Sequence, residues 1–116
     1  PLSLKCSGIN EMYEKLSEDL KNFGEYDTLA VLCLDADRAK EAYDRLKDTE
    51  LNVHLFTKNS MKFDRGISVM PFYLAKGLEF DGVFVPELQD YKEPLHRQAL
   101  YINATRALHV LRLYTL

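Results

Sequence analysis

Two carboxylates follow an apolar segment in an arrangement that could serve phosphate chemistry. Asp35 and Asp37 come directly after Thr28–Leu34 (TLAVLCL), a continuous apolar run that predicts a strand buried on both faces. Such a pair could hold Mg²⁺ beside a phosphate, or supply the nucleophile and the acid of a phosphatase that works through an aspartyl-phosphate. The alternative is structural, with Asp35 capping the next helix and Asp37 favouring its positive end. The structural interpretation is favoured, since two acids after a strand are common.

A second charged group lies between two apolar, strand-like segments. The insert AKGLEFD at residues 75–81 brings Lys76, Glu79 and Asp81 together near a strand end. One interpretation is a functional strand–loop–strand with these charged groups gathered at a strand end. The equally weighted alternative is a solvated turn in which Gly77 relieves backbone strain.

A third candidate is a single arginine near the expected end of a helix. Arg106 stands between the small residues Ala104 and Ala107 in the segment YINATRALH at residues 101–109. Taken alone, the favoured interpretation is a solvated side chain. An arginine held by small neighbours could instead reach a phosphate across an interface, because guanidinium offers five donors in a planar fork.

Alternating strands and helices must position these residues. Apolar periodicity predicts one helix between Asn10, as its N-cap, and Gly24, a second after Asp35, and a third over Leu95–Ala107 whose apolar residues fall on two faces. Strands are expected at 2–6, 28–34, 53–56, 67–72, 82–85 and 110–114, with a polar loop at 58–66. This alternation predicts an α/β fold with a largely parallel sheet flanked by helices. Ligands of such sheets gather at the carboxyl ends of strands, so we expect the site after Leu34, Phe72 and Val85, and before Val110.

Composition sets limits on the function. The chain has 116 residues, of which 47% are hydrophobic and 28% charged, as expected for one folded domain. Its net charge is −3 and its pI about 5.6, so nucleic-acid binding by the chain alone should be weak. No apolar run approaches the roughly 20 residues of a membrane helix. Cys6 and Cys33 lack partners at metal-binding spacing, and a reducing cytoplasm fits best.

The second and third groups together resemble a known family. A strand, AKGLEFD, another strand, an acidic link, a helix ending in ATRA and a last strand resemble motifs V and VI of superfamily 1A helicases of the UvrD, Rep and PcrA kind. The resemblance extends from Gly66 to Tyr114. Tyr73–Asp81 and Thr105–His109 look most like HelD, a helicase-like ATPase that acts on bacterial RNA polymerase. Typical members carry Thr-x-His at the positions of Pro71 to Tyr73, which puts strand separation in doubt.

The resemblance implies a role for each matching residue. Arg106 looks like the arginine finger that reaches the γ-phosphate of ATP, and Thr105 would support it. Glu79 looks like the carboxylate that binds the ribose hydroxyl. Lys76 and Gly77 look like the loop that links nucleotide to nucleic acid, where Lys76 would also contact the strand. Tyr73 could stack on a base.

The resemblance also implies what lies elsewhere. The sequence has no GxxxxGK[ST] phosphate loop, so the chain is expected to be a P-loop NTPase-type, RecA-like C-terminal domain without its own P-loop. It would be a fragment spanning 1–116, with ATP and Mg²⁺ held mainly by the N-terminal RecA-like domain of the same protein. Single-stranded DNA is the expected partner, and RNA polymerase an alternative. The remaining alternative is the Mg²⁺-dependent phosphatase built on Asp35 and Asp37.

Overall fold

Six parallel strands form one sheet in the order β1-β6-β5-β2-β4-β3. The computed structural model describes residues 2–60 and 65–116. The strands are β1 (Leu2–Lys5), β2 (Thr28–Cys33), β3 (Val53–Leu55), β4 (Gly66–Pro71), β5 (Phe80–Val85) and β6 (Ala107–Thr115). The predicted α/β fold with a parallel sheet is therefore confirmed.

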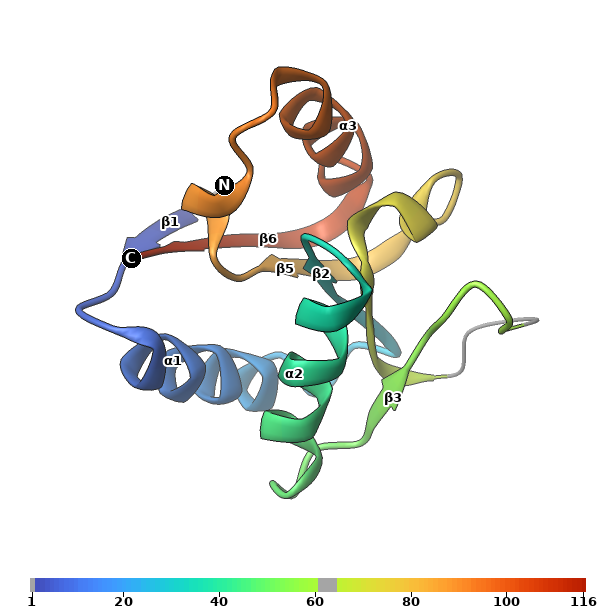
Figure 1. Ribbon diagram of the computed structural model, residues 1–116. Coiled ribbons are helices and arrows are strands. Elements are labelled where there is room, and N and C mark those ends of the chain that lie inside the picture. The colour runs from blue at the N-terminus through green and yellow to red at the C-terminus, as the bar shows by residue number, and fades with distance from the viewer. Residues whose placement is uncertain (1, 61–64) are drawn as a thin grey trace.

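Helices cover both faces of this sheet (Figure 1). The helices α1 (Ile9–Asn22) and α2 (Ala36–Lys47) pack on one face. The opposite face is covered by α3 (Pro94–Ala104) and by two short 3₁₀ helices, η1 (Phe72–Ala75) and η2 (Leu88–Asp90). The sheet thus separates two apolar cores.

The central strand β2 shows why its sequence is apolar throughout. Leu29, Val31 and Cys33 point into the core beneath α1 and α2, whereas Ala30 and Leu32 point into the core beneath α3. Side chains alternate between the faces of a strand, so a strand covered on both faces needs apolar residues at every position.

The start of α2 follows the sequence prediction, whereas the start of α1 does not. Asp35 caps α2, and its Oδ1 accepts a hydrogen bond of 2.8 Å from the Arg38 amide. Asn10, the predicted cap of α1, lies inside that helix, which begins at Ile9 with Gly8 as its N-cap. The Glu11 carboxylate accepts bonds from the amide and hydroxyl of Ser7, which ties the residue before Gly8 to the first turn of the helix.

The end of α3 also differs from the prediction. The helix stops at Ala104 rather than Ala107, because Ala107 already pairs with Phe80 in the sheet. One predicted apolar face is buried through Leu100 and Ala104, while Leu95 and Ile102 on the other face are exposed. Within the described part of the chain, α3 therefore packs on one side.

Two further expectations concern the chain as a whole. In the described ranges, no helix is both long and apolar enough to cross a membrane. Within the polar loop predicted at 58–66, residues 61–64, including the basic Lys62, lie outside the described residues.

Candidate nucleotide-facing edge

The candidate residues of the second and third groups lie at one edge of the sheet. Lys76, Gly77 and Glu79 precede β5, and Thr105 and Arg106 precede β6. The first residues of these strands, Phe80 and Ala107, are paired across the sheet. Since paired strands run about 4.8 Å apart, the two segments meet at the amino ends of β5 and β6. This edge is opposite to the one expected from parallel sheets in general.

The charged side chains at this edge point away from the core. Lys76, Glu79 and Arg106 are exposed, and none has a side-chain hydrogen bond or ion pair with another described residue. Gly77 has a φ of 81°, which a residue with a side chain adopts only with strain, and no atom lies within 4 Å of a Cβ placed there. The glycine therefore serves the turn that returns the chain from η1 to β5.

Arg106 occupies a two-residue link rather than a helix. Thr105 terminates α3, and its hydroxyl donates to the carbonyl of Tyr101 at 2.8 Å. The Arg106 amide donates to the carbonyl of Asn103 at 3.3 Å. The backbone that presents Arg106 is thus tied to the last turn of α3 although its side chain is free of described partners.

Asp81 belongs to the support of this edge. Its Oδ2 accepts bonds from the amide and the hydroxyl of Thr28, at 3.2 and 3.3 Å, and its own amide donates to that hydroxyl. The Asp81 carboxylate also lies 4.0 Å from Nε2 of His109, whose ring stacks on Tyr26 at a centroid distance of 5.0 Å. These contacts bind the amino ends of β2, β5 and β6 to one another.

A bulge in β6 explains why His109 faces outward. Between the pairs Phe80–Ala107 and Gly82–Val110, β6 contains one residue more than β5. Leu108 and His109 are consequently both exposed, where a regular strand would alternate. Sequence analysis missed this support, because neither the bulge nor the Thr28–Asp81 bond has a local signature.

Tyr73 lies at the other end of η1. It follows Pro71, the last residue of β4, and its side chain is 52% exposed. Phe72, between them, is buried and meets the Tyr73 ring edge-on at 5.6 Å between centroids. Of the three positions where the family typically carries Thr-x-His, only the last is therefore open to a ligand.

Asn103 connects these two regions and was absent from the expected site. It is buried among apolar residues of α3, and its Nδ2 donates to the carbonyl of Phe72 at 2.9 Å. The sequence held a signal: Asn103 shares helical spacing with the buried Leu100 and Ala104, so a polar residue stood on an apolar stripe.

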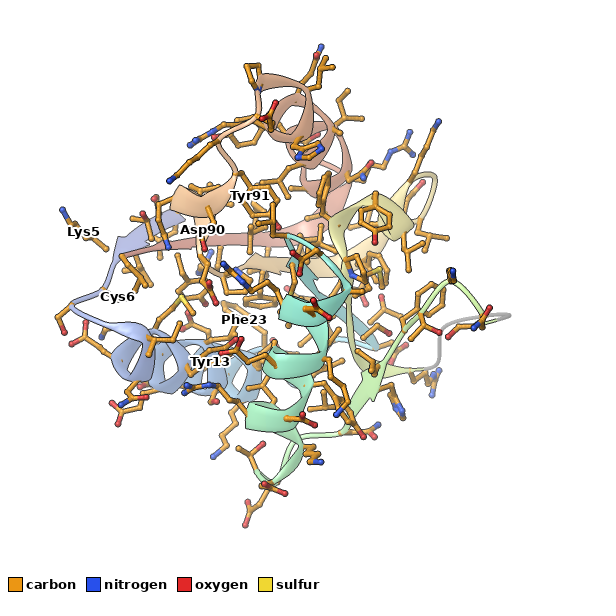
Figure 2. All side chains as sticks on the ribbon, in the orientation of Figure 1. Lys5, Cys6, Tyr13, Phe23, Asp90 and Tyr91 are labelled. Carbon is orange, nitrogen blue, oxygen red and sulfur yellow. The ribbon has the colours of Figure 1, made fainter. Side chains whose placement is uncertain are left out.

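Charges at the carboxyl ends of β2 and β5 are arranged differently. Arg38 on α2 forms ion pairs with Glu87 and Asp90, which lie just after β5 (Asp90 is labelled in Figure 2). Burial raises the pKa of Glu87. Partial burial of Asp90 opposes its charged form, but the hydrogen bond from Arg38 outweighs this and lowers the pKa of Asp90. At this carboxyl edge the charged side chains therefore pair with one another.

Buried aromatic side chains hold this carboxyl edge in place. Tyr91, labelled in Figure 2 beside Asp90, is fully buried, and its hydroxyl donates to the carbonyl of Leu32 at 3.3 Å. Burial raises the pKa of the Tyr91 hydroxyl, which keeps it a donor. Tyr13 approaches the same edge from α1, on the other face of the sheet. The segment after β5 is therefore anchored to β2.

The phosphatase alternative finds no support in this geometry. The Asp35 carboxylate is engaged in capping α2, as the structural interpretation predicted. In residues 2–60 and 65–116, no group of three or more His, Cys, Asp or Glu side chains is arranged to hold a metal ion.

Two hollows formed by the described residues do not coincide with the charged edge. One, of about 450 Å³, lies between α1, β2 and the start of β4, and the other, of about 460 Å³, follows the outer side of β6. Neither is lined by Lys76, Glu79 or Arg106. An open, charged edge is expected where the second wall of a cleft belongs to another domain, since ligand sites often lie at domain interfaces.

Comparison with known proteins assigns the fold. The chain aligns over 98% of its length with the C-terminal domain of the DEAD-box protein Dbp5 (TM-score 0.69, 15% identity, 74% of that chain covered). It aligns equally with the Sulfolobus solfataricus SWI2/SNF2 ATPase core in complex with dsDNA (TM-score 0.70, 15% identity, 27% of that chain covered). At these identities the likeness concerns the fold alone, which is that of a RecA-like helicase domain.

Sequence similarity points to one kind of helicase domain within this fold. Residues 66–114 match the family model of the UvrD-like helicase C-terminal domain. The C-terminal domain of a possible DNA helicase from Lactobacillus plantarum WCFS1 is 28% identical, with a TM-score of 0.84 over 100% of this chain and 73% of that chain. No curated protein sequence matches. These two findings support a superfamily 1 helicase C-terminal RecA-like domain, and the match to the family model lies in residues 66–114.

Proposed function

We propose that the chain supplies one half of an ATP site in a motor that moves along single-stranded nucleic acid. The observation that carries the proposal is the shared edge at the amino ends of β5 and β6. There the exposed Glu79 and Arg106 immediately precede the paired residues Phe80 and Ala107, and the exposed Lys76 lies in the loop before β5. Exposed charges without described partners are available to a ligand. The other half of the site, with the phosphate loop and Mg²⁺, would belong to an N-terminal RecA-like domain.

The residue types at this edge suit the parts of ATP. The guanidinium of Arg106 would reach the γ-phosphate and stabilise charge that develops during hydrolysis. Glu79 would accept a hydrogen bond from the ribose, and Lys76 would add positive charge. Thr105 and Gly77 would hold the two loops in shape. Mg²⁺ neutralises phosphate charge when bound, and the open edge offers it no carboxylate cluster among the described residues.

Movement would follow from closing and opening of the cleft. ATP between the domains would draw Arg106 inward, and hydrolysis would release it. Tyr73, exposed at the start of η1, would stack on a base of the strand, with Lys76 contributing charge near the other end of the same short helix. Translocation needs these contacts only, and strand separation is not part of the proposal.

A HelD-type role is the second candidate, and one observation favours it. Tyr73 stands where typical UvrD-like members carry a DNA-contacting His. In that case the partner of the full-length protein would be RNA polymerase. The two candidates differ in whether its ATP hydrolysis is stimulated by single-stranded DNA or by polymerase.

The half-site proposal predicts that the chain alone is inactive. Purified residues 1–116, supplied with ATP and Mg²⁺, should fold but show no turnover, because the phosphate loop that provides most phosphate contacts is lacking. Phosphate release and circular dichroism test this together. Steady turnover that is lost when Asp35 and Asp37 are both changed to Asn would overturn the proposal in favour of a phosphatase.

A further inference from the structure

Asn103 is a polar residue in an apolar environment. It is 6% exposed and lies in the core beneath α3, beside the buried Leu100 and Ala104. An apolar side chain of similar size would fill this space as well. The property that distinguishes the amide is its directed donor, which bonds the carbonyl of Phe72 at 2.9 Å. A buried amide without a hydrogen-bond partner would destabilise the fold. Asn103 is therefore tolerated at this buried position because it bonds the carbonyl of Phe72.

The two ends of this hydrogen bond lie beside the two proposed ligand contacts. Phe72 immediately precedes Tyr73, the exposed aromatic residue at the start of η1. On the other side, the carbonyl of Asn103 accepts the amide hydrogen of Arg106 at 3.3 Å. One residue therefore contacts the backbone of both segments, through its side chain on one side and its main chain on the other.

Other contacts make this junction stiff. The Phe72 ring is buried and meets Tyr91 edge-on at 5.4 Å, so it cannot move without disturbing the core. The end of α3 is closed by the bond from the Thr105 hydroxyl to Tyr101. A displacement of η1 would therefore act on α3 through the Asn103 amide rather than be absorbed by a flexible link.

We infer that Asn103 is a positioning residue that transmits occupancy of the Tyr73 surface by single-stranded nucleic acid to Arg106. A base stacked on Tyr73 would bias the position of η1, and the Phe72–Asn103 bond would carry this to the link that holds Arg106. The inference rests on the proposed function, because it presupposes that Arg106 serves ATP hydrolysis. The side chain of Asn103 would thus couple the Tyr73 surface to Arg106.

The test uses the full-length protein and measures ATP hydrolysis with and without an oligodeoxythymidine strand. Asn103→Ala removes the donor and keeps a residue suited to a helix. The stimulated rate should fall about 5- to 30-fold, more than the basal rate, within the range typical of coupling between sites. Asn103→Gln, which keeps an amide, should recover part of the stimulation. Ser68→Ala, at another buried polar residue, is the control and should change neither rate.

A double-mutant cycle with Tyr73→Ala separates coupling from a purely structural role. If Asn103 acts through Tyr73, the two losses should not add, and the double variant should be stimulated as much as the more impaired single variant. Additive losses, or basal and stimulated rates that fall in parallel with the melting temperature, would overturn the inference. Should Asn103→Ala fail to fold, Asn103→Leu, which fills the space without a donor, replaces it in the same cycle.

The outcome also distinguishes this inference from the proposed function. A wild-type protein whose hydrolysis responds to the strand, alongside an Asn103→Ala variant that responds equally, overturns the inference alone. A wild-type protein that hydrolyses no ATP, or whose hydrolysis ignores both the strand and Arg106→Ala, overturns the proposed function and the inference with it.

Discussion

Both edges of the sheet carry charged side chains but use them differently. At the carboxyl ends of β2 and β5, Arg38 is paired with Glu87 and Asp90. At the amino ends of β5 and β6, Glu79 and Arg106 are exposed and lack side-chain partners among the described residues. Charges that satisfy one another stabilise a fold, whereas charges left open remain available to a ligand or another domain.

This difference qualifies a general rule about parallel sheets. A domain that builds its own site places it at the carboxyl ends of its strands. A domain that completes the site of a neighbour can present any edge that faces the neighbour. The exposed charges of this chain stand at the amino edge, as expected if it forms the second wall of a shared cleft.

The change Arg106→Ala in the intact protein should distinguish the roles of the two edges most clearly. We expect ATP turnover to fall by roughly 10³- to 10⁵-fold, the contribution of arginine fingers in GTPases, or about 4–7 kcal/mol of barrier. Stability should hardly change, since the side chain is exposed and has no hydrogen bond or ion pair with another described residue. Arg106→Lys should restore little, because a point charge cannot reproduce the planar fork.

Single-turnover hydrolysis measures this effect, with the melting temperature as a check on folding. Arg65→Ala is a matched control, because Arg65 is also an exposed arginine, next to the amino end of β4. It should leave the rate unchanged. An Arg106→Ala variant that hydrolyses ATP at the wild-type rate would remove the proposed arginine finger.

The reverse pattern is expected for Arg38→Ala at the carboxyl edge. Removing the guanidinium leaves Glu87 and Asp90 close together without their cation, and Glu87 is half-buried. Hydrogen bonds to charged groups contribute about 1.5–3 kcal/mol, and partial exposure of Arg38 reduces this, so we expect a loss of about 1–2 kcal/mol. Catalysis per folded molecule should be unaffected.

Urea denaturation of the purified chain provides the measurement. Lys40→Ala serves as the comparison, because Lys40 lies on the same helix and pairs with Asp44 at the exposed surface. Its removal should change the free energy of unfolding by no more than about 0.5 kcal/mol. Equal effects of the two changes would show that the carboxyl-edge cluster does not stabilise the fold.

The smallest expected effect concerns Asp35, for which the sequence allows two interpretations, a helix cap and a catalytic acid. Asp35→Ala should lower the stability by about 1 kcal/mol, the usual contribution of an N-cap. Asp35→Asn should retain most of it, since Asn caps helices as well as Asp does. A phosphatase nucleophile would behave otherwise, because Asn could not replace it and both variants would lose phosphate-ester hydrolysis equally.

Local patterns were sufficient where the physical cause is local. A continuous apolar run identified the buried strand β2, and Asp35 was recognised as a cap because its carboxylate bonds an amide only three residues away. The errors occurred where a distant segment competes with a local preference. Asn10 suits an N-cap, but its side chain accepts a bond from Arg45 on α2, and the helix begins before it with Gly8 as the N-cap.

The end of α3 shows the same competition more directly. Alanines and arginine favour helix over residues 104–107, and the sequence predicts its continuation. The structure ends it at Ala104, because Ala107 forms sheet pairs with β5. Arg106 is thereby turned from a helical residue into part of an exposed link.

The sequence by itself determined the alternating elements, the apolar stripes and the two motifs that resemble helicases, since all of these depend on residues near one another in the chain. Only the tertiary structure decided that Glu79 and Arg106 share the amino edge, and that Asn103 joins Phe72 to the backbone of Arg106. The order of strands in the sheet sets those neighbours. The strand order depends on burying both apolar cores at once, and this burial involves contacts between segments that are distant in the sequence.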